Sequence, residues 1–258
     1  MPRTSFVLGV AALAGLATSA SAQVADLGFG GSSPVTVVSK GMSTSDNVLW
    51  DNGPLETEPG FSVLGPDDNI LGYGHQLPST NFVGDDFSVG AGGWQIDSFT
   101  FFAYQTGGDP TASSFTDVSM TVYAGPVGDT SSPVASYSGL ASSTFTGIFR
   151  SSDTSPRGTN RPIYANEVLT PGLSLSAGDY WVAWASAGSL TSGPWAPPVT
   201  PFVSDGNAVQ SIGGGDFVPV TQASGHPDEL PFVIQGVPTP GALALFGLGG
   251  LAAIRRRR

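Results

Sequence analysis

The chain has 258 residues and no cysteine, and its 20 acidic residues against nine basic ones give a formal net charge of −11 at pH 7. Such an acidic chain repels phosphate groups, which excludes nucleic acid as a partner. Without cysteine it has neither disulfides nor thiolate chemistry, but a chain of this length can bury a sufficient hydrophobic core without them.

The first 22 residues have the pattern of a secretory signal peptide. Arg3 supplies a positive start, residues 6–17 are apolar, and Ala20-Ser21-Ala22 is a small-x-small cleavage site. The apolar run is too short to span a bilayer as a permanent anchor. We therefore expect cleavage directly after Ala22.

Residues 23–236 are predicted to form one all-β domain. Gly, Pro, Ser and Thr interrupt this segment throughout, and short runs of β-branched and aromatic residues recur between them. The pattern favours a two-sheet sandwich, jelly-roll-like in its topology. The expected strands are residues 34–39, 81–89, 94–104, 117–124, 144–149, 163–169, 180–187 and 230–235.

Three of these runs differ in how their apolar residues alternate. Residues 118–123 alternate strictly, as in a strand with one buried face. Residues 94–104 change parity, which indicates either a bulge near Asp97 or a central strand covered on both faces. Residues 180–185 are apolar on both faces, so we expect both Trp181 and Trp184 in the core.

Several motifs of the body resemble a recurring type of bacterial secreted β-sandwich protein. The resemblance covers most of residues 82–236, and it supports the fold while implying no activity. The motifs are Gly84-Asp85-Asp86-Phe87-Ser88-Val89, Gly92-Gly93-Trp94-Gln95-Ile96-Asp97, Phe101-Phe102-Ala103-Tyr104-Gln105-Thr106-Gly107, Asn160-Arg161-Pro162-Ile163-Tyr164, Ser176-Ala177-Gly178-Asp179-Tyr180-Trp181-Val182 and Ser192-Gly193-Pro194-Trp195-Ala196-Pro197-Pro198.

The sequence predicts no catalytic residues, and we expect the protein not to be an enzyme. Its two histidines, His75 and His226, stand beside Gly and Pro, and neither an HExxH nor a GxSxG motif is present. Adjacent Asp85 and Asp86 should point to opposite faces of a strand. A Ser-His-Asp triad assembled from distant residues stays an alternative.

A structural calcium ion is the expected cofactor if the domain has one. The body holds all 20 acidic residues and four basic ones, a formal charge of −16, which attracts cations. Asp67, Asp68 and Asn69 form a compact oxygen-rich turn, and extracellular calcium sites need only millimolar-range affinity. An Asx turn explains the same three residues without a metal.

Two of the five tryptophans are candidate platforms for a sugar ring. Trp195 stands among prolines, as in an ordered loop, and Trp50 is the other candidate. Stacking on either ring would make the domain a carbohydrate-binding module. Alternatively, Trp195 plugs one end of the sandwich.

Residues 237–258 have the pattern of a membrane sorting signal. Pro238-Thr239-Pro240 precedes an apolar run to Ile254, and Arg255, Arg256, Arg257 and Arg258 end the chain. From Val237 the run is just long enough for a single hydrophobic helix to span a bilayer, and terminal arginines favour the cytoplasmic side. The segment resembles the PEP-CTERM sorting signal of Gram-negative bacteria, with threonine where the family has glutamate.

This resemblance implies an exosortase-type processing enzyme as partner and a precursor held transiently in the inner membrane. With the signal peptide, it predicts an exported protein of the cell surface or extracellular matrix. We expect it to act in display, adhesion or matrix structure, and a surface polysaccharide is the expected ligand under the carbohydrate-binding alternative.

Overall fold

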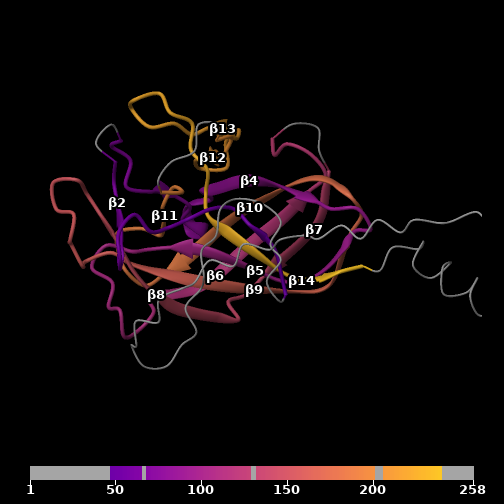
Figure 1. Cartoon of the computed structure of the whole chain (residues 1–258), viewed down its shortest axis with the longest axis horizontal. Coiled ribbons are helices and arrows are strands. Elements are labelled where there is room, and N and C mark those ends of the chain that lie inside the picture. Colours follow the sequence, from indigo (N-terminus) through magenta and orange to yellow (C-terminus); the bar gives the residue numbers. More distant parts are fainter. Residues whose placement is uncertain (1–46, 66–67, 129–131, 201–205, 240–258) are drawn as a thin grey trace, which may run out of the picture. The chain divides into compact units, whose positions relative to one another are not determined.

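Figure 1 shows a computed structural model of the chain, which describes residues 47–65, 68–128, 132–200 and 206–239. Within these ranges the protein is all-β, because every regular element except the short 3₁₀ turn η1 (Leu77–Ser79) is a strand. No helix in the described ranges is long and apolar enough to cross a membrane. The predicted signal peptide and the apolar helix of the tail lie outside the described residues.

Each predicted strand from residue 81 onward overlaps an observed strand, whereas the prediction at 34–39 lies outside the described residues. The remaining strands, of two to six residues each, were not predicted. In chain order the strands are β1 (Val48–Asp51), β2 (Phe61–Val63), β3 (Tyr73–Gly74), β4 (Phe82–Val89), β5 (Trp94–Ala103), β6 (Phe115–Tyr123), β7 (Pro133–Ser138), β8 (Ser142–Ser151), β9 (Pro162–Leu175), β10 (Gly178–Gly188), β11 (Trp195–Ala196), β12 (Val209–Ser211), β13 (Val218–Pro219) and β14 (Phe232–Pro238).

The strands form two six-stranded sheets and one small sheet. The first large sheet has the order β1-β14-β5-β9-β8-β2, and the second has the order β13-β12-β4-β10-β6-β7. β11 and β3 form the small sheet. Neighbouring strands are antiparallel except for the pair β2 and β8. The chain crosses between the large sheets repeatedly, since β4, β5 and β6 alternate between them.

One hydrophobic core takes side chains from both large sheets. Phe101 of β5 stacks on Trp184 of β10 with 4.6 Å between ring centroids and 17° between planes, and both rings are fully buried. In β6 the alternating residues Val118, Met120 and Val122 are all completely buried, as predicted. Burial of large aromatic rings is therefore a main stabilising contribution to the fold.

The two tryptophans of β10 lie on different faces of the strand. Trp184 belongs to the shared core, whereas Trp181 is half-buried and packs against a small cluster with Val127, Ala183 and Val209. The prediction for Trp184 is confirmed, and the prediction that Trp181 is in the same core is wrong. Because both faces of β10 are apolar, sequence alternation alone did not distinguish them.

Strand β5 combines both explanations offered for its mixed parity. Its pairing with β9 shifts register between Ile96 and Ser98, which confirms the bulge near Asp97. After the bulge, Phe101 points into the shared core, and Phe102 belongs to a second hydrophobic cluster. This second cluster supports Trp195 and thereby positions the candidate site described below.

The last strand runs beyond residue 236, where we expected the domain to end. Val237 and Pro238 are opposite Gln95 and Trp94 of β5, and the Thr239 N–H donates to the Gly93 carbonyl at 2.9 Å. The beginning of the predicted sorting segment is therefore attached to the first sheet.

Candidate functional site

Arg150 in β8 is buried, with 1% of its surface exposed. Its Nε donates to the Leu71 carbonyl at 2.8 Å and its Nη2 to the Ile70 carbonyl at 3.3 Å. Its Nη1 donates to the hydroxyls of Ser62 at 3.1 Å and Thr200 at 3.2 Å. Burial lowers the pKa of Arg150 to about 10, so the side chain is still charged at neutral pH. Arg150 therefore joins three distant segments by hydrogen bonds.

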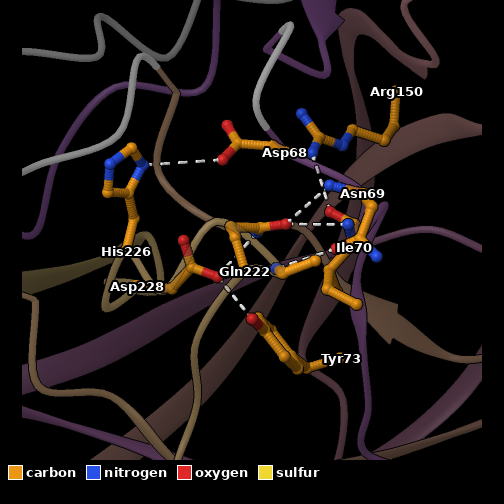
Figure 2. Close-up of polar contacts among 9 residues, drawn as sticks. Asp68, Asn69, Ile70, Tyr73, Arg150, Gln222, His226 and Asp228 are labelled. Atoms are coloured by element: carbon orange, nitrogen blue, oxygen red, sulfur yellow. Dashed lines mark hydrogen bonds and ion pairs between the residues drawn. The ribbon is translucent and has the colours of Figure 1, made fainter.

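A second buried network lies beside Arg150, as Figure 2 shows. The Tyr73 hydroxyl and the Gln222 amide both donate to the Asp228 carboxylate. The Gln222 side-chain oxygen accepts the N–H groups of Asn69 at 3.1 Å and Ile70 at 2.7 Å. Burial raises the pKa of Asp228, against the effect of its two hydrogen bonds. These polar groups are satisfied internally, as expected for a structural network.

The structure describes two of the three predicted calcium ligands, Asp68 and Asn69. Asn69 Oδ1 accepts the Ala223 N–H at 3.0 Å, and Asp67 lies outside the described residues. Asp68 Oδ1 is buried without a hydrogen-bond donor among the described residues and lies 4.0 Å from His226 Nδ1. Asp68 therefore faces a histidine in an ion-pair geometry, and calcium binding here stays a prediction.

A carboxylate cluster that we did not predict includes two residues from the middle of β4. Side-chain oxygens of Asp85, Asp86 and Glu229 all come within 4.8 Å of one another. Asp85 is fully buried and Asp86 is half-buried, as expected for opposite faces of a strand, yet both contribute a carboxylate oxygen to this cluster. The Asn52 amide donates to Asp85 at 2.9 Å and to Glu229 at 3.2 Å. Three carboxylates could hold a hard cation, but 144 residues separate Asp85 from Glu229, so no local motif reveals the cluster.

A serine–histidine contact is also present, and it is wholly buried. His75 Nε2 lies 3.1 Å from the Ser186 hydroxyl, and both residues are 0% exposed. His75 Nδ1 faces the Tyr73 carbonyl rather than a carboxylate. Burial lowers the pKa of His75 to about 4. A substrate has no access to this pair, and the imidazole lacks the acidic partner of a catalytic triad.

The two tryptophans proposed as sugar platforms have different surroundings. Trp50 is 8% exposed, belongs to the shared core, and donates its indole N–H to Asn52 at 3.0 Å. It offers no ring face to a ligand, so this prediction is wrong. Trp195 is half-buried and lines a surface hollow of about 230 Å³.

Main-chain contacts hold Trp195 in place. β11 pairs with β3, and the backbone groups of Trp195 and Tyr104 exchange two hydrogen bonds of 2.9 and 3.0 Å. Gly193, at φ +103°, lies under the indole, where a Cβ would come within 2.7 Å of the ring. The turn before Trp195 therefore requires glycine, both for its positive φ and for the close approach of the ring.

The hollow is also lined by the polar residues Tyr104, Thr106, Arg161 and Ser192, and by Leu71 and Gly72. The guanidinium of Arg161 has no hydrogen-bond or ion-pair partner among the described residues. Tyr104 is 2% exposed, yet its hydroxyl makes no hydrogen bond in that part of the chain. Burial raises the pKa of Tyr104 to about 12, so the group is a neutral hydrogen-bond donor.

The hollow is thus an open site that combines an aromatic ring with the Arg161 guanidinium and the Tyr104 hydroxyl, neither of which has a hydrogen-bond partner among the described residues. Such a combination is typical of small-ligand sites. The buried networks around Arg150 and Asp85 lack this openness. In comparisons with known proteins, neither a family model nor a curated protein matches the chain.

Proposed function

We propose that the chain is an exported, non-enzymatic protein of the cell surface or extracellular matrix, delivered by its PEP-CTERM-like tail. The observation that carries this proposal is the pairing of two sorting patterns at opposite ends. Ala20-Ser21-Ala22 follows an apolar run, and Pro238-Thr239-Pro240 precedes one that ends in arginines. An exosortase-type enzyme is the expected processing partner.

The strand order supports a jelly-roll sandwich for the displayed body. Within the first sheet the order β1-β14-β5-β9 and within the second the order β4-β10-β6-β7 place strands distant in the chain beside each other. A chain that alternates between two sheets in this way makes the two Greek keys of a jelly roll. Such a sandwich is a rigid scaffold that presents its loops to the outside.

The attachment of β14 supports delivery through the C-terminus. Pro238 pairs with Trp94, and Thr239 bonds Gly93, so the tail leaves the domain from a strand fixed in the sheet. Removal of residues after Pro240 would leave every strand of the body in place. Processing and folding are therefore compatible.

The internal hydrogen bonding of the charged groups supports a non-enzymatic body. The carboxylates of Asp85 and Asp228 accept hydrogen bonds from side chains, and both groups are buried. General acid–base catalysis needs a titrating group within reach of the substrate, and these carboxylates are engaged in the fold instead.

Deletion of Arg255–Arg258 tests the sorting proposal. We expect the deleted protein to accumulate unprocessed or mislocalised, while a matched variant with four lysines keeps the positive charge and its orientation. Surface display is measured on intact cells, and mass spectrometry identifies the mature ends. Display of the deletion variant at the wild-type level would contradict the proposal.

Carbohydrate binding is the second candidate function, and the hollow beside Trp195 favours it. The half-buried indole offers an apolar surface, and hydroxyls of Thr106 and Ser192 lie around it. An apolar platform with a few hydrogen-bonding groups suits a sugar ring. This function is compatible with display, because a surface polysaccharide is then the partner that retains the protein.

A further inference from the structure

The hollow beside Trp195 contains a positive charge that no side chain in the described ranges neutralises. Arg161 lines it without a partner among the described residues, although the body has a formal charge of −16. By contrast, Arg157 pairs with Glu58 at 3.4 Å, and Arg150 donates to several buried oxygens. A lone guanidinium in an acidic domain is therefore a local exception that suits an anionic ligand group.

The geometry of the arginine side chain limits which anionic group can bind. Its planar fork of N–H groups matches the two oxygens of a carboxylate, and it forms shorter and stronger hydrogen bonds with ionised acceptors. The neutral Tyr104 hydroxyl, also unpaired in the described structure, supplies another donor in the same hollow. Two donors of this kind favour an acceptor-rich anion over a neutral group.

The indole of Trp195 limits the chemical character of the rest of the ligand. The half-buried indole lines the same hollow as the two donors, so a ligand that contacts all three must present an apolar surface and a carboxylate close together. The hollow of about 230 Å³ is smaller than the ~300–1,000 Å³ typical of sites for drug-sized ligands. One ring fits this size better than a long oligosaccharide.

We propose that this hollow binds a single acidic sugar, a hexuronate residue of a surface polysaccharide. The Arg161 guanidinium holds the carboxylate, the Tyr104 hydroxyl donates to a ring substituent, and Trp195 covers the C–H face of the ring. This inference rests on the carbohydrate-binding function and adds its substrate class.

The charge of the body limits the kind of polysaccharide. The acidic surface would repel a dense polyanion. A lone carboxylate can still be attracted by Arg161 at short range, because salt at physiological concentration screens charges that lie more than ~8 Å away. The proposed ligand is therefore a terminal or widely spaced uronate in a mostly neutral chain.

The test measures binding of methyl glucuronide, methyl glucoside and acetate to the purified full-length chain by saturation-transfer NMR and calorimetry. We expect the glucuronide to bind more tightly than the glucoside, and acetate to bind much more weakly than either. Arg161→Gln should lower glucuronide affinity roughly tenfold or more, the effect of losing charge-assisted hydrogen bonds, and leave the glucoside unchanged.

Two further variants keep the result interpretable. Arg157→Gln removes an exposed arginine outside the hollow and should change neither affinity. Trp195→Phe keeps an aromatic ring if Trp195→Ala does not fold, and it should weaken both glycosides. Equal binding of glucuronide and glucoside would overturn the acidic-sugar inference while carbohydrate binding survives. If acetate binds as tightly as the glucuronide, the hollow is only an anion site. If neither glycoside binds, both the carbohydrate-binding function and the acidic-sugar inference are overturned.

Discussion

Arg150 and Arg161 are neighbours in the fold, but the side chain of Arg150 is buried and hydrogen-bonded, whereas that of Arg161 lines an open hollow. The Arg150 N–H donates to the Arg161 carbonyl at 2.9 Å, so their backbones touch between β8 and β9. The Arg150 side chain is 1% exposed and donates to carbonyls and hydroxyls of three segments. The Arg161 side chain lines the open hollow and has no partner among the described residues. The fold satisfies the first arginine with hydrogen bonds, whereas it leaves the second without a partner in the described part of the chain.

This contrast separates structural polar groups from candidate binding groups. Burying a charge costs free energy unless hydrogen bonds compensate it, which the partners of Arg150 do. An unpaired charge at an open surface costs the fold little and retains its capacity to bind. The same distinction applies to Tyr73, whose hydroxyl bonds Asp228, and Tyr104, whose hydroxyl has no partner in the described ranges.

Replacing the buried arginine should have the largest effect. Arg150→Met leaves buried carbonyl and hydroxyl oxygens without donors, and we expect the free energy of unfolding to fall by about 3–5 kcal/mol. Chemical denaturation followed by tryptophan fluorescence measures this. Arg157→Gln, at an exposed arginine, should be close to wild type. A loss below about 1 kcal/mol for Arg150→Met would mean that its hydrogen bonds do not organise the fold.

The buried His75 also predicts that the free energy of unfolding depends on pH. Burial lowers the pKa of His75 from 6.5 to about 4. Between these pH values the unfolded chain binds a proton at His75 and the folded protein does not. Stability is therefore full above pH 6.5 and falls toward pH 4, by about 3 kcal/mol in total from this group.

His75→Gln isolates this contribution. The difference between the wild-type and variant unfolding free energies should shrink as the pH falls through this window. Subtracting the two curves cancels other groups, including Asp228, whose raised pKa acts in the opposite direction. A difference that does not change with pH would contradict the assignment to His75.

The two buried tyrosines, Tyr73 and Tyr104, make a matched pair of substitutions, and the larger of the two effects on stability should be intermediate. Tyr73→Phe removes a donor to the buried Asp228 carboxylate and should cost about 1–3 kcal/mol of stability. Tyr104→Phe removes a hydroxyl that makes no hydrogen bond in the described structure, so stability should hardly change. Thermal melts of both variants test this. Similar losses at the two positions would show that the Tyr104 hydroxyl has a structural role.

The smallest effect on stability is expected at the hollow. Arg161→Gln should change the free energy of unfolding by no more than about 0.5 kcal/mol, as is usual for surface positions without special contacts. Denaturation under the conditions used for Arg150→Met allows direct comparison. A loss comparable to that of Arg150→Met would place Arg161 among the structural residues.

The sequence identified the long strands because their apolar residues recur with period two, as at Val118, Met120 and Val122. It did not separate Trp181 from Trp184, because a strand with two apolar faces gives no alternation. It also did not distinguish Arg150 from Arg161. Burial of Arg150 depends on acceptors at residues 62, 70, 71 and 200, which only the tertiary fold brings together.

The candidate site was predictable in part for a similar reason. Prolines around Trp195 indicated an ordered loop, whereas the structure places Trp195 in the short strand β11, where its half-buried ring lines the hollow. Nothing local linked it to Arg161 or Tyr104. Trp50 carried no signal that separated it from Trp195, since its burial follows from the pairing of β1 with β14. Pairings between distant segments are the information that local patterns lack.

The most direct test of the division between the two arginines is the melting temperature with added ligand. A ligand that binds only the folded state raises the melting temperature in proportion to its affinity. We predict that methyl glucuronide raises it more than methyl glucoside in the wild type, and that Arg161→Gln melts like the wild type without ligand but loses the difference between the sugars. An equal shift from glucuronide in wild type and Arg161→Gln would contradict the account.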